Sequence, residues 1–121
     1  MMIFQVKDYA TLQTALDGLC EELAVQKVHQ DRVFDCKLVA CELLGNVLKH
    51  GDGRADLQVE LRSGDIVLKV LSQTVFALPK QIECSGLLSE NGRGLFLVNT
   101  LCEGNVYTEE NVLVAKIRIE K

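Results

Sequence analysis

The sequence predicts an α/β domain in which three helices cover one face of a mainly antiparallel sheet. Residues 8–28 and 31–51 carry apolar side chains at the three- and four-residue spacings of amphipathic helices. Residues 55–62 alternate polar and apolar side chains, as a strand buried on one face does. The later strands come as two hairpins, so their neighbours run antiparallel. Helices packed on one face of such a sheet form a two-layer sandwich.

Length and composition indicate one ordinary globular domain over residues 1–121. A chain of 121 residues can bury one core, and 48% hydrophobic with 25% charged residues is typical of a globular protein. The net charge of −4 argues against a nucleic-acid binder, which needs a basic face. No apolar run approaches the about 18 residues of a membrane span, and the N-terminus lacks the pattern of a signal peptide. We therefore expect a cytoplasmic protein without direct contact to nucleic acid or membrane.

The cysteines favour reduced thiols in a cytosolic protein. There are five of them, so they cannot all pair, and none forms a C-x-x-C unit. Such spacing favours free thiols over the alternative of a zinc site. Three of the five lie inside apolar helical patterns, where a free cysteine behaves as a small hydrophobe. They are Cys20, Cys36, Cys41, Cys84 and Cys102.

A short strand and a helix are expected first. Residues 2–6 favour a strand, and helical spacing begins at Asp8, a candidate N-cap because its carboxylate can accept a first-turn hydrogen bond. The expected apolar stripe of this helix is Leu12, Ala15, Leu16, Leu19, Leu23 and Val28. Its charged residues are expected to be solvated.

The second helix carries two side-chain stripes of interest. The expected core stripe is Phe34, Leu38, Cys41, Gly45 and Leu48. Glu42 and Asn46 lie one turn apart on the next stripe, at the edge of that apolar face. A carboxylate and an amide at a core boundary suit a cation and a phosphate better than packing. The alternative is a plain solvated helix edge. His50 and Gly51 close the helix, with Gly51 as a C-cap.

The remaining chain predicts two hairpins separated by a long loop and a third helix. Strands are expected over 55–62 and 66–71 and again over 104–108 and 112–119. Residues 74–91 form the only long irregular stretch, and loops of this length in compact domains are usually functional or mobile. The third helix is expected over residues 94–102.

A glycine-rich turn precedes the third helix. In Gly92-Arg93-Gly94-Leu95 the glycines allow close backbone approach, so that N–H groups and a helix N-terminus can face an anion. Arg93 adds a cation that can contact phosphate oxygens. The alternative is an ordinary turn between a loop and a helix.

Together these stretches resemble the GHKL ATPases, the superfamily of gyrase, heat-shock chaperone ATPases, histidine kinases and mismatch-repair ATPases. Glu42-x-x-x-Asn46-x-x-x-His50-Gly51 resembles the N box, and residues 92–97 resemble the second glycine box. Chain length, the His-Gly pair and the gap between the boxes look most like the anti-sigma-factor serine kinase branch. The resemblance implies a Bergerat-type, histidine kinase-like ATPase domain that uses ATP and Mg²⁺.

The resemblance also implies roles for single residues. Asn46 matches the Mg²⁺ ligand, and Glu42 matches the general base that accepts a hydroxyl proton. Lys49 and His50 could face phosphate, although a solvated Lys49 is an equal alternative. The expected nucleotide-binding residues are Asn46, Lys49, His50, Gly92, Arg93, Gly94 and Leu95, with residues 74–91 as the lid.

The implied function is that of a bacterial regulator of transcription. A protein of this branch binds a small anti-sigma-antagonist domain or a sigma factor and phosphorylates a serine of the antagonist. A homodimer is compatible with the resemblance.

The chain departs from the family at the first glycine box. Ser72-Gln73-Thr74 stands where an Asp-x-Gly is expected, and Asn111-Val112 replaces a closing Gly-Thr pair. Two hypotheses follow. One is an ATP-dependent serine kinase of anti-sigma type. The other is a degenerate, non-catalytic module of the same fold that binds a protein partner with weak or no nucleotide binding.

Overall fold

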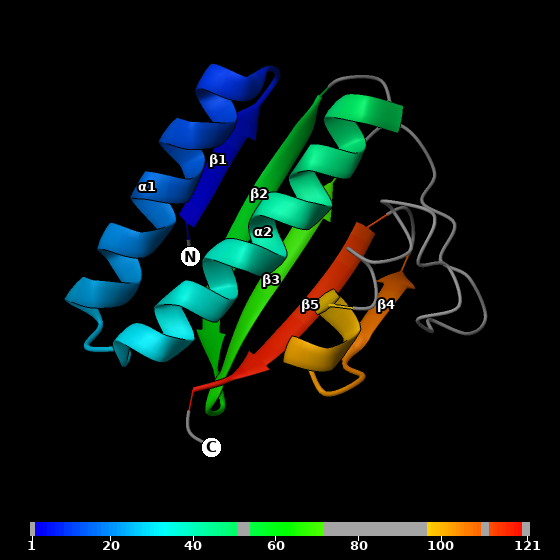
Figure 1. Cartoon of the computed structure of the whole chain (residues 1–121). Helices are drawn as coiled ribbons and strands as arrows, with labels where there is room; N and C mark the ends of the chain where they lie inside the picture. Colours follow the sequence, from blue (N-terminus) through cyan, green and yellow to red (C-terminus); the bar gives the residue numbers. More distant parts are fainter. Residues whose placement is uncertain (1, 51–53, 72–96, 110–111, 120–121) are drawn as a thin grey trace.

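Five strands form one antiparallel sheet, and the helices lie against one of its faces (Figure 1). The computed structural model describes residues 2–50, 54–71, 97–109 and 112–119. The elements are β1 (Met2–Val6), α1 (Tyr9–Val25), α2 (Gln30–His50), β2 (Ala55–Arg62), β3 (Asp65–Leu71), β4 (Val106–Glu109) and β5 (Val112–Arg118). Within the described part, a short third helix covers residues 97–101. The strand order is β1-β2-β3-β5-β4, with every neighbouring pair antiparallel. The predicted α/β class and antiparallel sheet are confirmed.

Helix α1 begins at a capping box, as the sequence predicted for Asp8. The Thr11 backbone N–H donates to Asp8 Oδ1 at 2.8 Å, and the Asp8 backbone N–H donates to the Thr11 hydroxyl at 3.0 Å. These bonds satisfy first-turn donors that a helix leaves without partners. The helix start is therefore fixed by two side chains of its own first turn.

The same capping contact predicts a pH-dependent contribution of Asp8 to stability. The backbone hydrogen bond from Thr11 is the main reason that the pKa of Asp8 lies below its ordinary value of 3.8. A carboxyl group whose pKa is lower in the folded than in the unfolded protein stabilises the fold at pH values above its unfolded-state pKa. This stabilisation is lost as the pH falls through the folded-state pKa. Asp8→Ala should therefore lower the melting temperature by a few degrees at neutral pH, and the difference should shrink below pH of about 4.

Thermal unfolding followed by circular dichroism at several pH values measures this effect. Glu21→Ala, at an exposed acid of the same helix without a capping contact, is the control. A difference between wild type and Asp8→Ala that stays constant down to pH of about 2 would contradict the capping role.

A glycine allows α1 to lie close to β1. A Cβ atom at Gly18 would stand 2.6 Å from Phe4 Cε1, well inside van der Waals contact. Phe4 alternates with Met2 and Val6 on the side of β1 that packs against the core. The missing side chain at Gly18 thus makes room for the aromatic ring that joins the edge strand to the helix layer.

The core-facing stripe of α2 differs from the predicted one. Its buried residues are Cys36, Val39, Ala40, Leu43, Leu44 and Val47. The predicted stripe was wrong for most of its residues, because Phe34 is 59% exposed and Cys41 is exposed as well, and only Leu48 of the predicted set packs against the core. The observed face buries six apolar residues around a wider arc, whereas Gly45 would contribute no apolar side chain to the predicted face. The wider face removes more apolar area from water.

The open face of the sheet is covered by its own long side chains. Val67 and Val114 point away from the helices yet are only 3% and 1% exposed. Lys116 lies opposite Val67 in the register, while Lys69 and Tyr107 lie on either side of Val114. The Lys116 ammonium stands 5.6 Å from the centroid of the Tyr107 ring. Lysines at these register positions can lay their aliphatic stems over neighbouring valines while their charged ends stay in water.

The described cysteines are all free thiols. Cys36 and Cys102 are buried, Cys20 is half-buried and Cys41 is exposed. Burial raises the pKa of the Cys36 thiol strongly and raises the pKa of Cys102 to about 12, so both act as small hydrophobes. Cys84 lies outside the described residues. Across the described ranges, no helix combines the length and apolar character needed to cross a membrane.

Candidate functional site

The candidate site is built on the flank of α2, where Glu42 and Asn46 lie one turn apart. Their Cβ atoms are about 6 Å apart, as for any pair four residues apart on a helix. Both residues are half-buried, because Leu43 and Val47 beside them point into the core. Packing of these neighbours fixes the helix rotation, so the carboxylate and the amide stay on one side of α2.

That side of α2 faces the short third helix. Asp35 shares the stripe of Glu42 and Asn46, being seven and eleven residues before them. Burial is the main cause of the raised pKa of Cys102, which directly follows the third helix, and of Cys36, and the nearby Asp35 charge raises the pKa of both thiols further. The third helix and α2 lie on the same face of the sheet (Figure 1). The stripe therefore lies on the side of α2 that faces the third helix.

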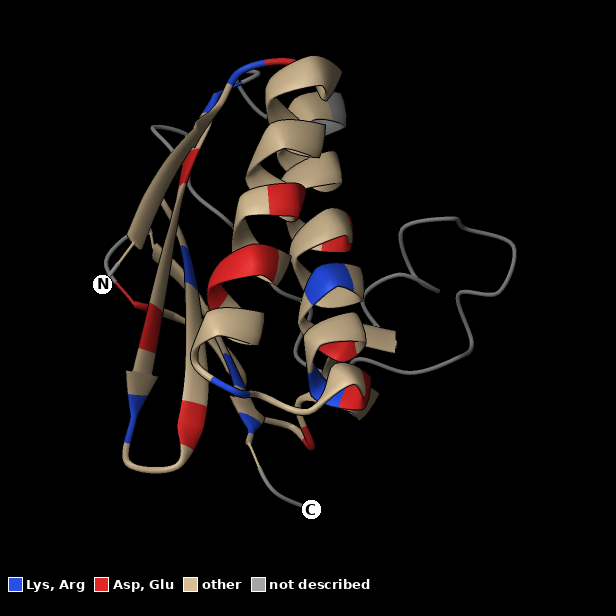
Figure 2. Cartoon of the chain, turned by 90° about the vertical axis from the view of Figure 1, so that its left-hand side faces the viewer, with Lys and Arg blue, Asp and Glu red and all other residues tan. Residues whose placement is uncertain are grey.

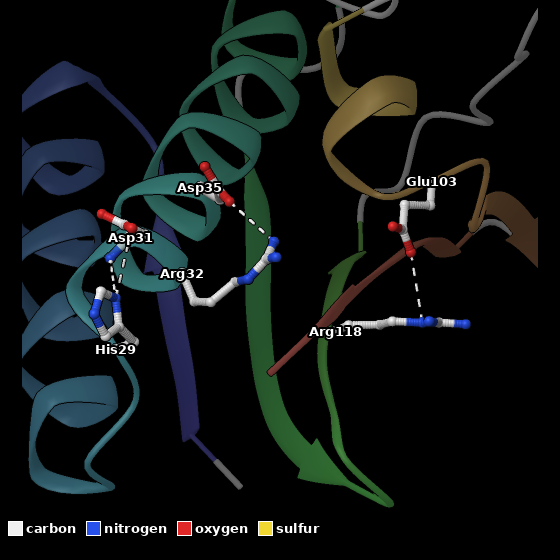
Figure 3. A network of polar contacts seen from close by, with 6 residues as sticks. All are labelled: His29, Asp31, Arg32, Asp35, Glu103 and Arg118. Atoms are coloured by element: carbon white, nitrogen blue, oxygen red, sulfur yellow. Dashed lines mark hydrogen bonds and ion pairs between the residues drawn. The ribbon is translucent and has the colours of Figure 1, made fainter. Parts of the chain in front are cut away.

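An ion pair occupies the first turn of this stripe. Arg32 Nη1 lies 3.2 Å from Asp35 Oδ2, and the two side chains are only 13% and 20% exposed (Figure 3). The guanidinium compensates the Asp35 charge at this half-buried position. The sequence analysis did not single out this pair, although opposite charges at i and i+3 are a recognisable helix signal. The exposed Glu103–Arg118 pair, at 3.5 Å, is screened by water and contributes little.

Further along the stripe, Glu42 and Asn46 have polar side-chain atoms that can still accept hydrogen bonds or bind a cation. Within the described ranges, neither Glu42 nor Asn46 makes a side-chain hydrogen bond or an ion pair. Their neighbour Asp35 is paired by contrast. A half-buried carboxylate and amide in this state can accept hydrogen bonds or bind a cation from outside the described protein.

The donor set fits a magnesium ion that is held mainly by another molecule. Amide and carboxylate oxygens suit Mg²⁺, which commonly keeps several waters and takes one or two protein ligands together with phosphates. Among the described residues, no group of three or more His, Cys, Asp or Glu side chains could hold a metal ion alone. Asn46 is therefore compatible with an Mg²⁺ ion that phosphate groups and water hold together with one protein oxygen.

The other predicted site residues are placed only in part. Lys49 and His50 form the last turn of α2, but their side chains lie outside what the structure describes. Gly92, Arg93, Gly94 and Leu95 lie outside the described residues too, as do residues 72–91 with the predicted lid. The structure thus brings Glu42 and Asn46 together, and their approach to the glycine-rich turn stays a prediction.

Comparison of the chain with known protein families and with curated proteins finds no match.

Proposed function

We propose that this protein is a nucleotide-dependent regulator of the anti-sigma serine kinase type, which binds ATP with Mg²⁺ and a small protein partner. The observation that carries the proposal is the Glu42–Asn46 pair, half-buried on one flank of α2 and without a side-chain hydrogen bond or ion pair within the described part. Support also comes from the helix-covered antiparallel sheet, which is compatible with the Bergerat-type fold that the N-box resemblance implies.

The two residues would have separate roles at this site. Bound Mg·ATP would supply the phosphoryl group to be transferred. The Asn46 amide oxygen would be the protein ligand of the ion, held in place because α2 is anchored in the core by Leu43 and Val47. Glu42 would accept the proton of the attacking serine hydroxyl, since a positioned carboxylate suffices as a base when transfer depends mainly on orientation.

The second candidate function is a partner-binding module that lacks turnover. It is favoured by the stretch Ser72-Gln73-Thr74, which lacks the aspartate that would accept a hydrogen bond from an adenine amino group. A hydrogen bond to a charged group is worth about 1.5–3 kcal/mol, or about one to two decades of affinity. The missing aspartate therefore predicts weak binding of ATP and poor discrimination between ATP and GTP.

Calorimetric titration with ATP, ADP and GTP, with and without Mg²⁺, tests the proposal. We expect weak binding of ATP that strengthens when Mg²⁺ is present. Asn46→Ala should remove this Mg²⁺ dependence, because it deletes the proposed protein oxygen on the ion. Gln58→Ala, which removes a half-buried amide from the open face of the sheet, is the matched control and should leave the dependence unchanged.

The outcomes separate the two candidates. An Asn46→Ala variant that keeps the full Mg²⁺ dependence would exclude the assigned ligand. If the wild-type protein binds none of the three nucleotides, the kinase proposal fails and the partner-binding module remains.

A further inference from the structure

The outward face of α2 carries an apolar stripe that the fold does not bury. This outer stripe consists of Phe34, Leu38, Cys41 and Gly45, which share the side of the helix opposite its core-facing residues. Phe34 is 59% exposed, Cys41 is exposed, and Leu38 and Gly45 are half-buried. A Cβ atom built at Gly45 meets no atom of the described residues within 4 Å, so the described part of the chain leaves space above this end of the stripe. The stripe combines an aromatic knob with an open position three turns away.

The helix layer around this stripe is acidic, whereas the opposite face of the molecule is balanced. Helices α1 and α2 carry six acidic and three basic residues. The acidic residues are Asp17, Glu21, Glu22, Asp31, Asp35 and Glu42, and the basic residues are Arg32, Lys37 and Lys49. The helices accordingly show mostly the red of Asp and Glu and little of the blue of Lys and Arg in Figure 2. The open face of the sheet carries four residues of each sign, namely Asp56, Glu60, Asp65 and Glu109 with Arg62, Lys69, Lys116 and Arg118.

The charges next to the stripe have the same bias. Asp31 is exposed one turn before Phe34, and Glu42 is half-buried beside Cys41. Arg32 is engaged by Asp35, so Lys37 is the one cation left among the described side chains of α2. It lies between the stripe and α1, where its charge acts on Cys41 and on Cys20, which also senses the exposed Asp17. An apolar ridge in this setting attracts a positively charged counterpart.

We propose that the outer stripe of α2 binds an amphipathic helix of a partner protein, with apolar residues spaced three and four apart and lysine or arginine on both flanks. The acidic layer would repel anionic lipid and nucleic acid. A second copy of the chain would bring two acidic layers face to face. A basic helix complements both the apolar stripe and the surrounding charge.

The dimensions of the stripe suit one helix. Phe34 and Gly45 are eleven residues apart, which corresponds to about 16 Å along the helix axis. Phe34, at one end of the stripe, would be the main anchor, because aromatic residues that become fully desolvated dominate interface energies. A large partner side chain would enter the space above Gly45. This proposal locates the partner-binding part of the proposed function and does not depend on nucleotide binding.

A synthetic helical peptide of about 15 residues, with leucines at heptad spacing and lysines on both flanks, is the probe. Fluorescence anisotropy gives its affinity, and amide shift changes in ¹⁵N-labelled protein locate the contact. We expect shifts confined to α2 and neighbouring α1 residues. Phe34→Ser should weaken binding by about tenfold or more. Ile3→Ser removes a side chain of similar exposure, 55%, from the open sheet face and should leave the affinity unchanged.

Two further comparisons test whether the stripe prefers a positively charged helix. A peptide with glutamates in place of the lysines should bind at least about tenfold more weakly, and added salt should weaken the lysine peptide. Equal binding of both peptides, equal effects of Phe34→Ser and Ile3→Ser, or the absence of any binding would overturn the proposal. A wild-type dimer that the Phe34→Ser substitution dissociates would overturn it too, since the stripe would then bind a second copy.

The Asn46→Ala variant should still bind the peptide, and the Phe34→Ser variant should still bind nucleotide as the wild type does. A failure of the nucleotide proposal thus remains distinguishable from a failure of this one.

Discussion

Leu68→Ala is expected to lower the free energy of unfolding by about 3–5 kcal/mol. Leu68 is fully buried at the centre of β3, with Val59 of β2 and Ala115 of β5 as its register partners. Strands on both sides hold the backbone in place, so the structure cannot collapse into the space that the side chain leaves. The loss therefore includes a cavity term as well as the transfer term of the deleted methyl groups.

Urea denaturation followed by circular dichroism measures this loss from the shift in midpoint at constant slope. Leu61→Ala is the control, because Leu61 lies on the same sheet face but is 40% exposed near the end of β2. It should cost less than about 1 kcal/mol. Similar losses for the two variants would contradict the assignment of Leu68 to the centre of the core.

The elements that the sequence predicted well depend on local patterns. The Asp8 cap could be recognised because a capping box is formed within one turn of one helix. The alternation over residues 55–62 matches β2, whose inward positions are buried up to Val59. The turn at Ser63 and Gly64 joins β2 to β3, and both residues have positive φ angles of 53° and 84°. Such signals need no knowledge of what lies elsewhere in the chain.

The rotation of α2 could not be predicted in this way. Both Phe34 and Cys36 begin apolar series with helical spacing, and periodicity alone does not say which series meets the sheet. The choice depends on how much apolar area each face can bury against the sheet, including β3 and β5, which lie well beyond any local window of the helix. Val67 and Val114 show the same limit, since their burial on the open sheet face depends on lysines from neighbouring strands.

The candidate site also has one part that follows from local sequence and one part that does not. The spacing of Glu42 and Asn46 is local, so the sequence could place them together on one flank of α2. The direction of that flank is not local, because it depends on how the buried residues of α2, such as Leu43 and Val47, pack against the sheet. The expected approach of Gly94 to Asn46 involves residues beyond the described ranges and stays a prediction.

Glu42→Ala is expected to abolish phosphoryl transfer while sparing nucleotide binding. A general base acts only in the chemical step, so its removal should lower the turnover rate by about 10²–10⁴-fold without changing the dissociation constant of Mg·ATP. Glu42→Gln keeps the size of the side chain and should lose activity to the same extent, because an amide cannot take up the proton. Glu22→Gln neutralises a half-buried glutamate on α1 and serves as the control.

A coupled assay of ADP release, run with an anti-sigma-antagonist domain as phosphoryl acceptor, and calorimetry on the same preparations measure the two quantities. Glu42 makes no side-chain hydrogen bond or ion pair in the described part, so neither substitution removes such an interaction from that part of the fold. Unchanged binding with lost turnover would assign Glu42 to the chemical step. Equal loss of binding and turnover would assign it to the structure of the α2 flank, and full activity in Glu42→Gln would exclude it as the base.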